Sequence, residues 1–106
     1  MLPSGMALAR SGAPGPRRTD APRNVVGLQI RKLRRQQRMT QPALAARCQV
    51  LGYDLSRESL SKIEARLRSV SDAEVLMLAE ALKVPYTLLF PEPEQMGAAL
   101  RFFKIR

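Results

Sequence analysis

The segment from Arg57 to Leu67 carries side chains whose types and spacing suit contacts with nucleic-acid bases. On a helical wheel at 100° per residue, Leu60, Ile63 and Leu67 fall within about 60° of one another and form a narrow apolar line. The polar side chains away from that line are Arg57, Glu58, Ser61 and Lys62. In a major groove about 12 Å wide, Arg and Lys bond to guanine and Glu accepts from cytosine. The same face also suits an ordinary solvated helix. The neighbouring elements are therefore needed to distinguish a nucleic-acid contact from a solvated surface.

Glu64 lies at the edge of this apolar line rather than opposite it. A carboxylate in that position needs a cationic partner, because an unpaired buried charge is costly. The basic segment that comes earlier in the chain offers Arg31, Lys32, Arg34 and Arg35. We therefore expect an ion pair between that segment and the third predicted helix.

Apolar spacing and capping residues predict two helices before this segment. The first runs from residue 25 to about 38, and its apolar side chains at helical spacing are Val26, Ile30 and Leu33. The second follows Thr40, whose side chain suits an N-cap, and it stops near Gly52. The side chains that the second helix is expected to bury are Leu44, Cys48 and Leu51.

Similar signals predict the remaining elements of the compact region. Ser56 suits the N-cap of the third helix, and SDAE at residues 71–74 is a capping box that opens a fourth. The fourth helix is expected to bury Val75, Leu78, Ala79 and Leu82. Pro85 starts a last short helical turn, YTLLF. Residues 25–90 thus hold five predicted helices and no strand, which predicts an all-α domain.

Two flanking segments differ in composition from this domain. Residues 1–24 are rich in Gly, Pro and Arg with little to bury, so we expect a flexible, disordered basic arm that is either solvated or laid along a phosphate backbone. Residues 91–106 form a short C-terminal tail that ends in LRFFKIR, a possible interaction segment. The pattern of the tail leaves strand, helix and disorder open.

Composition narrows the possible functions. The 106-residue chain has a net charge of +9 and a pI of about 11.1, which favours an anionic partner such as nucleic acid. It has no histidine, a single cysteine (Cys48), no paired-carboxylate motif and no phosphate-binding Gly loop. We therefore expect no enzymatic activity, no cofactor and no metal. No apolar run approaches the roughly 18 residues of a membrane span, so we expect a cytoplasmic protein without a membrane partner.

The compact region resembles a known family. VVGLQIRKLRRQQRMTQPALAARC, SRESLSKIEARLRSV and AEVLMLAEALKVPYTLLF, in this order and spacing, are similar to the phage-repressor-like (XRE, or Cro-type) helix-turn-helix domain. The resemblance implies a five-helix, lambda-repressor-like fold and places Arg57, Glu58, Ser61 and Lys62 at base-reading positions. It implies that Gln41 contacts a phosphate and supports the third helix. It also suggests Arg34 as the partner of Glu64.

Two features depart from the family pattern. The link CQVLGYDLS between the second and third helices is about five residues longer than usual, which affects the expected crossing angle. Many relatives also have Gly two residues after the Glu, where this chain has Arg66. A left-handed end at Arg66 would cost of order 1 kcal/mol. Otherwise the third helix continues to Leu67.

These observations predict a sequence-specific DNA-binding transcriptional regulator, acting as a homodimer on an inverted repeat of double-stranded DNA. Phosphate contacts are expected from Gln41, Arg38, Arg47, Arg66 and Arg68. Candidate dimer contacts, with an intramolecular role favoured for the first two, are Leu88, Leu89, Phe90, Phe102, Phe103 and Ile105. The alternative is an antitoxin or adaptor that binds a protein partner through residues 91–106, with DNA binding secondary.

Overall fold

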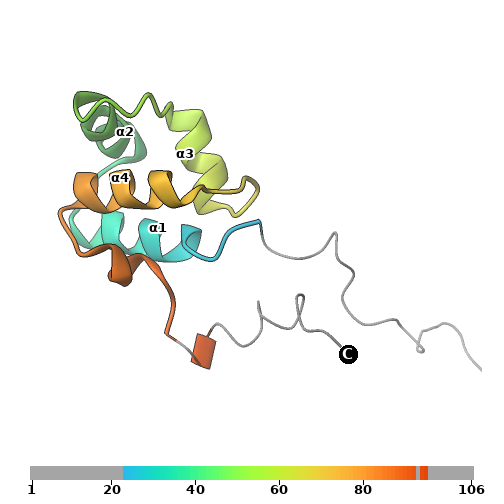
Figure 1. Cartoon of the computed structure of the whole chain (residues 1–106). Helices are drawn as coiled ribbons and strands as arrows, with labels where there is room; N and C mark the ends of the chain where they lie inside the picture. The colour runs from blue at the N-terminus through green and yellow to red at the C-terminus, as the bar shows by residue number, and fades with distance from the viewer. Residues whose placement is uncertain (1–22, 93, 96–106) are drawn as a thin grey trace, which may run out of the picture.

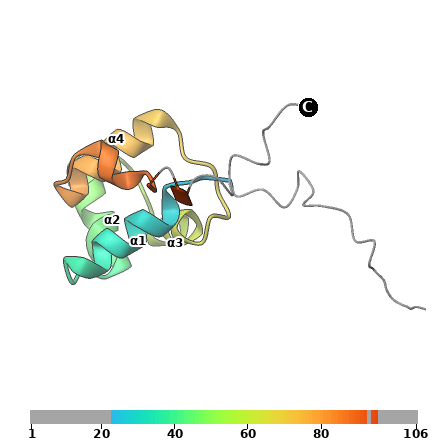
Figure 2. The same cartoon turned by 90° about the horizontal axis from the view of Figure 1, so that it is seen from below.

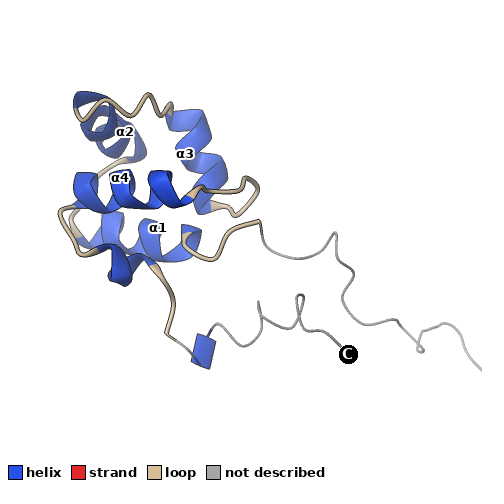
Figure 3. Ribbon diagram, viewed as in Figure 1, coloured by secondary structure: helices blue, strands red, loops and turns tan. Residues whose placement is uncertain are grey.

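The computed structural model describes residues 23–92 and 94–95, and this part of the chain contains helices but no strand (Figure 3). The α-helices are α1 (Gly27–Gln36), α2 (Gln41–Val50), α3 (Arg57–Glu64) and α4 (Asp72–Leu82), followed by the 3₁₀-helix η2 (Tyr86–Leu89) (Figure 1). The predicted all-α fold is therefore confirmed, although its fifth helix is a single 3₁₀ turn. Nearly all of the predicted N-terminal arm, and the tail residues 96–106 with their apolar side chains, lie outside the described residues.

The helices pack around one apolar core. α2 packs against α3 and α4, α1 packs against α3 and α4, and η2 packs against α1 and α4 (Figures 1 and 2). The largest fully buried side chains are Ile30, Leu44, Leu55, Leu60, Ile63, Leu78, Leu82 and Leu89, with Cys48. Every helix contributes to this set, so the orientation of α3 depends on all of its neighbours. No helix in the described range is both long and apolar enough to cross a membrane.

The predicted helix starts of α2, α3 and α4 are confirmed at atomic detail. Thr40 accepts a hydrogen bond from the backbone N–H of Ala43 at 3.2 Å, and Ser56 accepts one from Ser59 at 3.0 Å. The capping box at Ser71 and Glu74 is complete, because each side chain accepts from the other residue's backbone N–H. These caps satisfy donors that the first turn of a helix leaves free.

The predicted helix ends are less accurate. The predicted helix at 57–67 ends at Glu64, because Arg66 adopts a left-handed conformation with φ of 61°. Leu67 is therefore not part of the buried line and is 65 % exposed. The first helix spans Gly27–Gln36, shorter than predicted at both ends.

Two predicted core side chains are also on the surface. Leu51 lies just beyond the end of α2 and is 40 % exposed, because the chain turns there toward Gly52. Leu88 is 46 % exposed, whereas its neighbour Leu89 is fully buried under α1 and α4. Within a four-residue 3₁₀ turn only one of two adjacent side chains can face the core.

Candidate nucleic-acid interface

α3 presents a charged surface on one side and contributes to the core on the other. Leu60 and Ile63 are fully buried, which fixes the rotation of the helix about its own axis. Arg57, Glu58 and Lys62 are exposed, and Ser61 is half-buried beside them. All four predicted base-reading residues thus share the outward side of one short helix.

A buried ion pair connects α1 to the end of α3. Arg34 Nε donates to Glu64 Oε2 at 2.7 Å, and Arg34 Nη2 donates to Glu64 Oε1 at 2.9 Å. The side chains are only 10 % and 3 % exposed. Arg34 Nη1 also donates to the carbonyl of Met39 at 2.7 Å, so one guanidinium holds α1, the α1–α2 turn and α3 together. The hydrogen bond to Glu64 raises the pKa of Arg34, so the guanidinium stays charged.

Gln41 occupies the space between this ion pair and the first residue of α3. Its Nε2 donates to Glu64 Oε1 at 3.0 Å, and its Oε1 accepts from Arg57 Nη1 at 3.5 Å. The first residue of α2 therefore touches both ends of α3. This contact restrains the Arg57 guanidinium, and it places the start of α2 beside the exposed side of α3.

Asn24 is a site-positioning residue that the sequence patterns did not reveal. Its Oδ1 accepts from the backbone N–H of Gly27 at 2.7 Å, at the start of α1. Its Nδ2 donates to the carbonyls of Ile63 at 3.2 Å and Arg68 at 2.8 Å. One buried amide thus joins the start of α1 to the end of α3 and to the loop that follows. An Asn three residues before a helical Gly is a capping signal, but its distant partners have no sequence signature.

Gly27 permits this close approach. A Cβ at this position would lie 2.1 Å from the carbonyl oxygen of Ile63 and 2.8 Å from Asn24 Oδ1. The backbone of α1 therefore rests directly on the last turn of α3. The sequence did not predict this close contact, because a Gly within a helix usually indicates only a lower helix stability.

Arg68, one of the predicted phosphate-binding residues, is engaged within the protein. Its Nη2 lies 2.7 Å from Glu74 Oε2, which also accepts a hydrogen bond of 2.7 Å from the Tyr53 hydroxyl. This cluster joins the α2–α3 link, the α3–α4 loop and the start of α4. Burial by itself would raise the pKa of Glu74, but hydrogen bonds from Arg68, the Ser71 backbone and Tyr53 outweigh burial and lower it to about 2.

We expect the cluster of Tyr53, Arg68 and Glu74 to make the folded chain less stable as the pH falls into the acid range. The pKa of Glu74 is lower in the folded chain than the usual value near 4.5, so its contribution is complete above about pH 4.5. That contribution is lost as the pH falls toward 2, because the carboxylate must then be protonated. Thermal melts between pH 5 and pH 2 should show a smaller decline for Glu74→Gln than for the unmodified chain. Parallel curves for the two chains would contradict the assignment.

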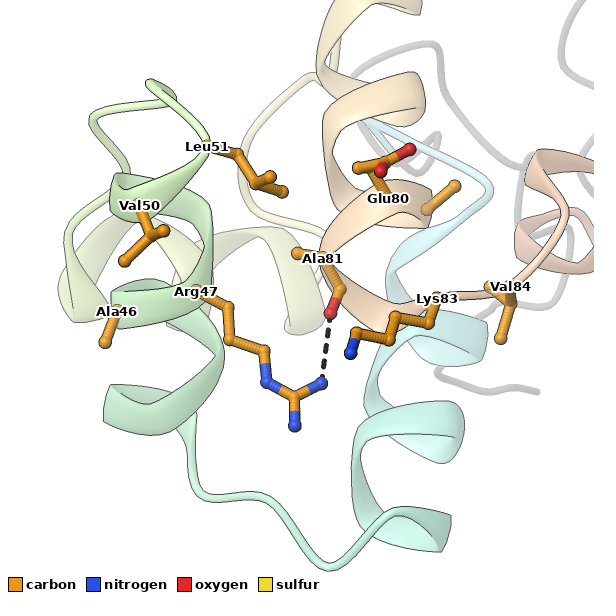
Figure 4. Close-up of a pocket in the computed structure, with 9 residues that line it drawn as sticks. Ala46, Arg47, Val50, Leu51, Glu80, Ala81, Lys83 and Val84 are labelled. Carbon is orange, nitrogen blue, oxygen red and sulfur yellow. Dashed lines mark hydrogen bonds between the residues drawn. The ribbon is translucent and has the colours of Figure 1, made fainter.

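Arg47 lies apart from the other predicted phosphate-binding residues. It donates to the carbonyl of Ala81 at 3.2 Å, at the end of α4 (Figure 4). Together with Val50, Leu51 and Lys83 it lines a groove of about 660 Å³ between α2 and α4, to which α3 contributes no residue. Arg47 therefore serves as a cap for the carbonyl end of α4.

Arg38 and Arg66 flank the α2–α3 unit. Both are exposed, and both have left-handed backbones with φ of 58° and 61°. Arg38 lies in the turn before α2, and Arg66 lies two residues beyond the end of α3. Arg38 thus precedes the α2–α3 unit, Arg66 follows it and Gln41 contacts both ends of α3, whereas Arg68 and Arg47 are bonded to residues outside α3. Within the described residues no group of three or more His, Cys, Asp or Glu side chains could hold a metal ion.

Comparison with known proteins agrees with this geometry. A family model described as helix-turn-helix matches residues 30–89, from within α1 to the end of η2. The solved structure of a hypothetical transcription factor, NHTF, from Neisseria is similar to this chain, with 25 % identity and a TM-score of 0.59. The match covers 78 % of this chain and 88 % of that one. No curated protein matched the sequence.

These findings support a DNA-binding domain rather than an enzyme. The family match spans more than half of the chain and includes the α2–α3 pair and the helices that hold it. The candidate interface described above occupies the α2–α3 pair, with three of the four predicted base-reading side chains exposed and the supporting ion pair buried. The chain therefore belongs to the XRE-type helix-turn-helix family.

Proposed function

We propose that this protein is a sequence-specific transcriptional regulator in which α3 enters the major groove of double-stranded DNA. The observation that carries the proposal is the outward side of α3, where Arg57, Glu58, Ser61 and Lys62 stand together on a helix whose rotation is fixed by the core. Arg and Lys match the acceptors of guanine, and Glu matches the amino group of cytosine. Ser61 and the neighbouring Ala65 leave the helix slim enough to enter the groove.

The phosphate contacts come from the residues around α3. Gln41 lies at the N-terminus of α2, where the helix dipole favours a phosphate. Arg38 and Arg66 bring cations to either side of the α2–α3 unit. Arg68 contributes less, because Glu74 already neutralises it, and Arg47 faces the groove between α2 and α4.

The protein acts as a homodimer on an inverted repeat. One eight-residue helix reads few base pairs, so two copies about one helical turn apart are needed for a specific site. Exposed apolar side chains around η2 supply a surface for such pairing, namely Tyr86, Leu88 and Phe90. Leu89, by contrast, is fully buried and serves the core of its own chain.

The decisive experiment is selection from a random duplex library at about 0.15 M salt. At lower salt concentrations a chain with a net charge of +9 would bind DNA of any sequence. We expect a palindromic motif with half-sites about one turn apart. In the double variant Arg57→Ala, Lys62→Ala the preference at the contacted bases should be lost, with each bidentate contact worth about 1–3 kcal/mol.

A matched control removes the same charge from another exposed surface. Arg31→Ala, Lys32→Ala takes two cations from α1, where both side chains are exposed, and should weaken binding without changing the motif. A motif of one half-site only would contradict the dimer. No enrichment, or the same motif in the Arg57, Lys62 variant, would contradict base reading by α3 and direct the search toward a protein partner.

A further inference from the structure

The four α-helices of the described region end in the same hydrogen-bonded turn. In each, one residue adopts a left-handed backbone and donates to the carbonyl three residues earlier, and the next residue donates to the carbonyl five residues before itself. At α3, for example, Arg66 N donates to Ile63 O at 3.0 Å and Leu67 N donates to Lys62 O at 2.8 Å. The four left-handed residues are Arg38, Gly52, Arg66 and Lys83.

Only α2 has the residue that this turn favours. Gly52 has φ of 91°, and glycine adopts such angles without the steric conflict that a Cβ creates. The ends of α1, α3 and α4 instead have long cations at φ of 58°, 61° and 59°. Attraction between a cation and the carbonyl end of a helix offsets part of this strain. An Arg or Lys kept at such a strained position points to a role for that side chain, and its surroundings indicate which role.

Two of these cations lie next to the α2–α3 unit along the chain, and the third lies at the end of α4, in a groove to which α3 contributes no residue. Arg38 precedes Gln41 by three residues, in the turn whose Met39 carbonyl accepts from Arg34. Arg66 lies two residues beyond the end of α3. Lys83 lines the groove between α2 and α4 that also contains Arg47, and Figure 4 shows its side chain beside the Arg47 guanidinium. The three residues have nearly the same backbone and different surroundings, so each one is a control for the others.

The side chain of Arg66 is also restrained at its base. A Cβ on Gly27 would lie 3.2 Å from Arg66 Cγ, so the stem of Arg66 rests over the start of α1 where that side chain is missing. A fixed backbone and a packed stem leave Arg66 fewer conformations to lose when its guanidinium binds an anion.

From this geometry we infer that Arg38 and Arg66 are a pair of DNA-phosphate contacts maintained in strained helix-end positions, and that Lys83 is not. The inference rests on the proposed DNA-binding function and adds that its two flanking arginines are kept at positions that strain the free fold. It also means that these two positions lower the stability of the free fold while they strengthen its complex with DNA.

The test compares glycine at each position in the full chain. Arg38→Gly, Arg66→Gly and Lys83→Gly should each raise the melting temperature without DNA, by about 4 °C for a domain of this size. Affinity is then measured against salt concentration, on the selected site and on an unrelated duplex. For Arg38→Gly and Arg66→Gly the slope of log K against log salt should fall by about 0.9 on both duplexes. Lys83→Gly should keep the slope of the unmodified chain.

Two further variants separate charge from backbone. Arg66→Gln removes the charge and retains the strain. It should lower the slope of log K against log salt as much as Arg66→Gly does, without the rise in melting temperature. Arg66→Lys should retain the slope. Unchanged slopes for Arg38→Gly and Arg66→Gly, or an equal loss for Lys83→Gly, would overturn the inference while leaving specific recognition intact. An unmodified chain that binds neither duplex would overturn the proposed function and this inference together.

Discussion

Glu64→Ala is expected to lower the free energy of unfolding by about 3–5 kcal/mol. The substitution leaves the Arg34 guanidinium, with only 10 % of its side chain exposed, without the carboxylate that accepts two of its hydrogen bonds. It also removes the acceptor of the Gln41 amide. A charge buried without a partner is far more costly than the loss of an exposed ion pair. The melting temperature should fall by about 12 °C or more.

Glu58→Ala is the matched control, because it makes the same change on the exposed side of the same helix. It should alter stability by no more than about 0.5 kcal/mol. Replacement of both partners, Arg34→Met with Glu64→Leu, should recover much of the loss, since it leaves no buried charge behind. If the Glu64→Ala chain melted at the same temperature as the unmodified protein, the ion pair would have to be accessible to water.

Gly27→Ala is expected to destabilise the fold by about 3 kcal/mol, although helix propensity by itself predicts a gain of about 1 kcal/mol. The new Cβ would lie 2.1 Å from the backbone carbonyl of Ile63, which belongs to α3 and cannot rotate away. To accept it, α1 must move off the last turn of α3. That movement would disturb the hydrogen bonds of Asn24 to both segments. Chemical denaturation measures the change directly.

Gly52→Ala separates steric conflict from backbone strain. No atom lies within 4 Å of a Cβ built on Gly52, and its φ is 91°, so this substitution should cost only about 1 kcal/mol of strain. The ordering of the two variants is the informative result. If Gly27→Ala proved as stable as the unmodified chain, α1 and α3 would not be in the close contact described here.

Helix starts and the main apolar positions were predictable because their causes are local. A hydroxyl at Thr40, Ser56 or Ser71 satisfies donors only two or three residues away, so neighbouring residues are sufficient to specify each cap. Leu60 and Ile63 point to the core because helical geometry places them on one side. The same geometry predicted the exposed side of α3 with its four candidate base-reading residues.

Helix ends were harder to predict because they depend on a balance between strain and distant contacts. A left-handed Arg66 is unfavourable by itself, which made continuation to Leu67 reasonable. The observed end places Ile63 O and Arg68 O where Asn24 can bond to both of them. Asn24 lies about 40 residues away in the chain, so no local sequence pattern shows that its hydrogen bonds offset the strain at Arg66.

The sequence by itself determined an all-α basic domain, the helix starts, most of the core and the need of Glu64 for a cation. Burial left four nearby cations as partners of Glu64, and only the family resemblance singled out Arg34. The tertiary structure shows that Arg34 reaches Glu64, which depends on how α1 crosses α3 and not on spacing along α1. It also separated Arg38 and Arg66 beside the recognition unit from Arg47, which caps α4. Charge and periodicity are properties of single segments, whereas a binding surface is made by the packing of several.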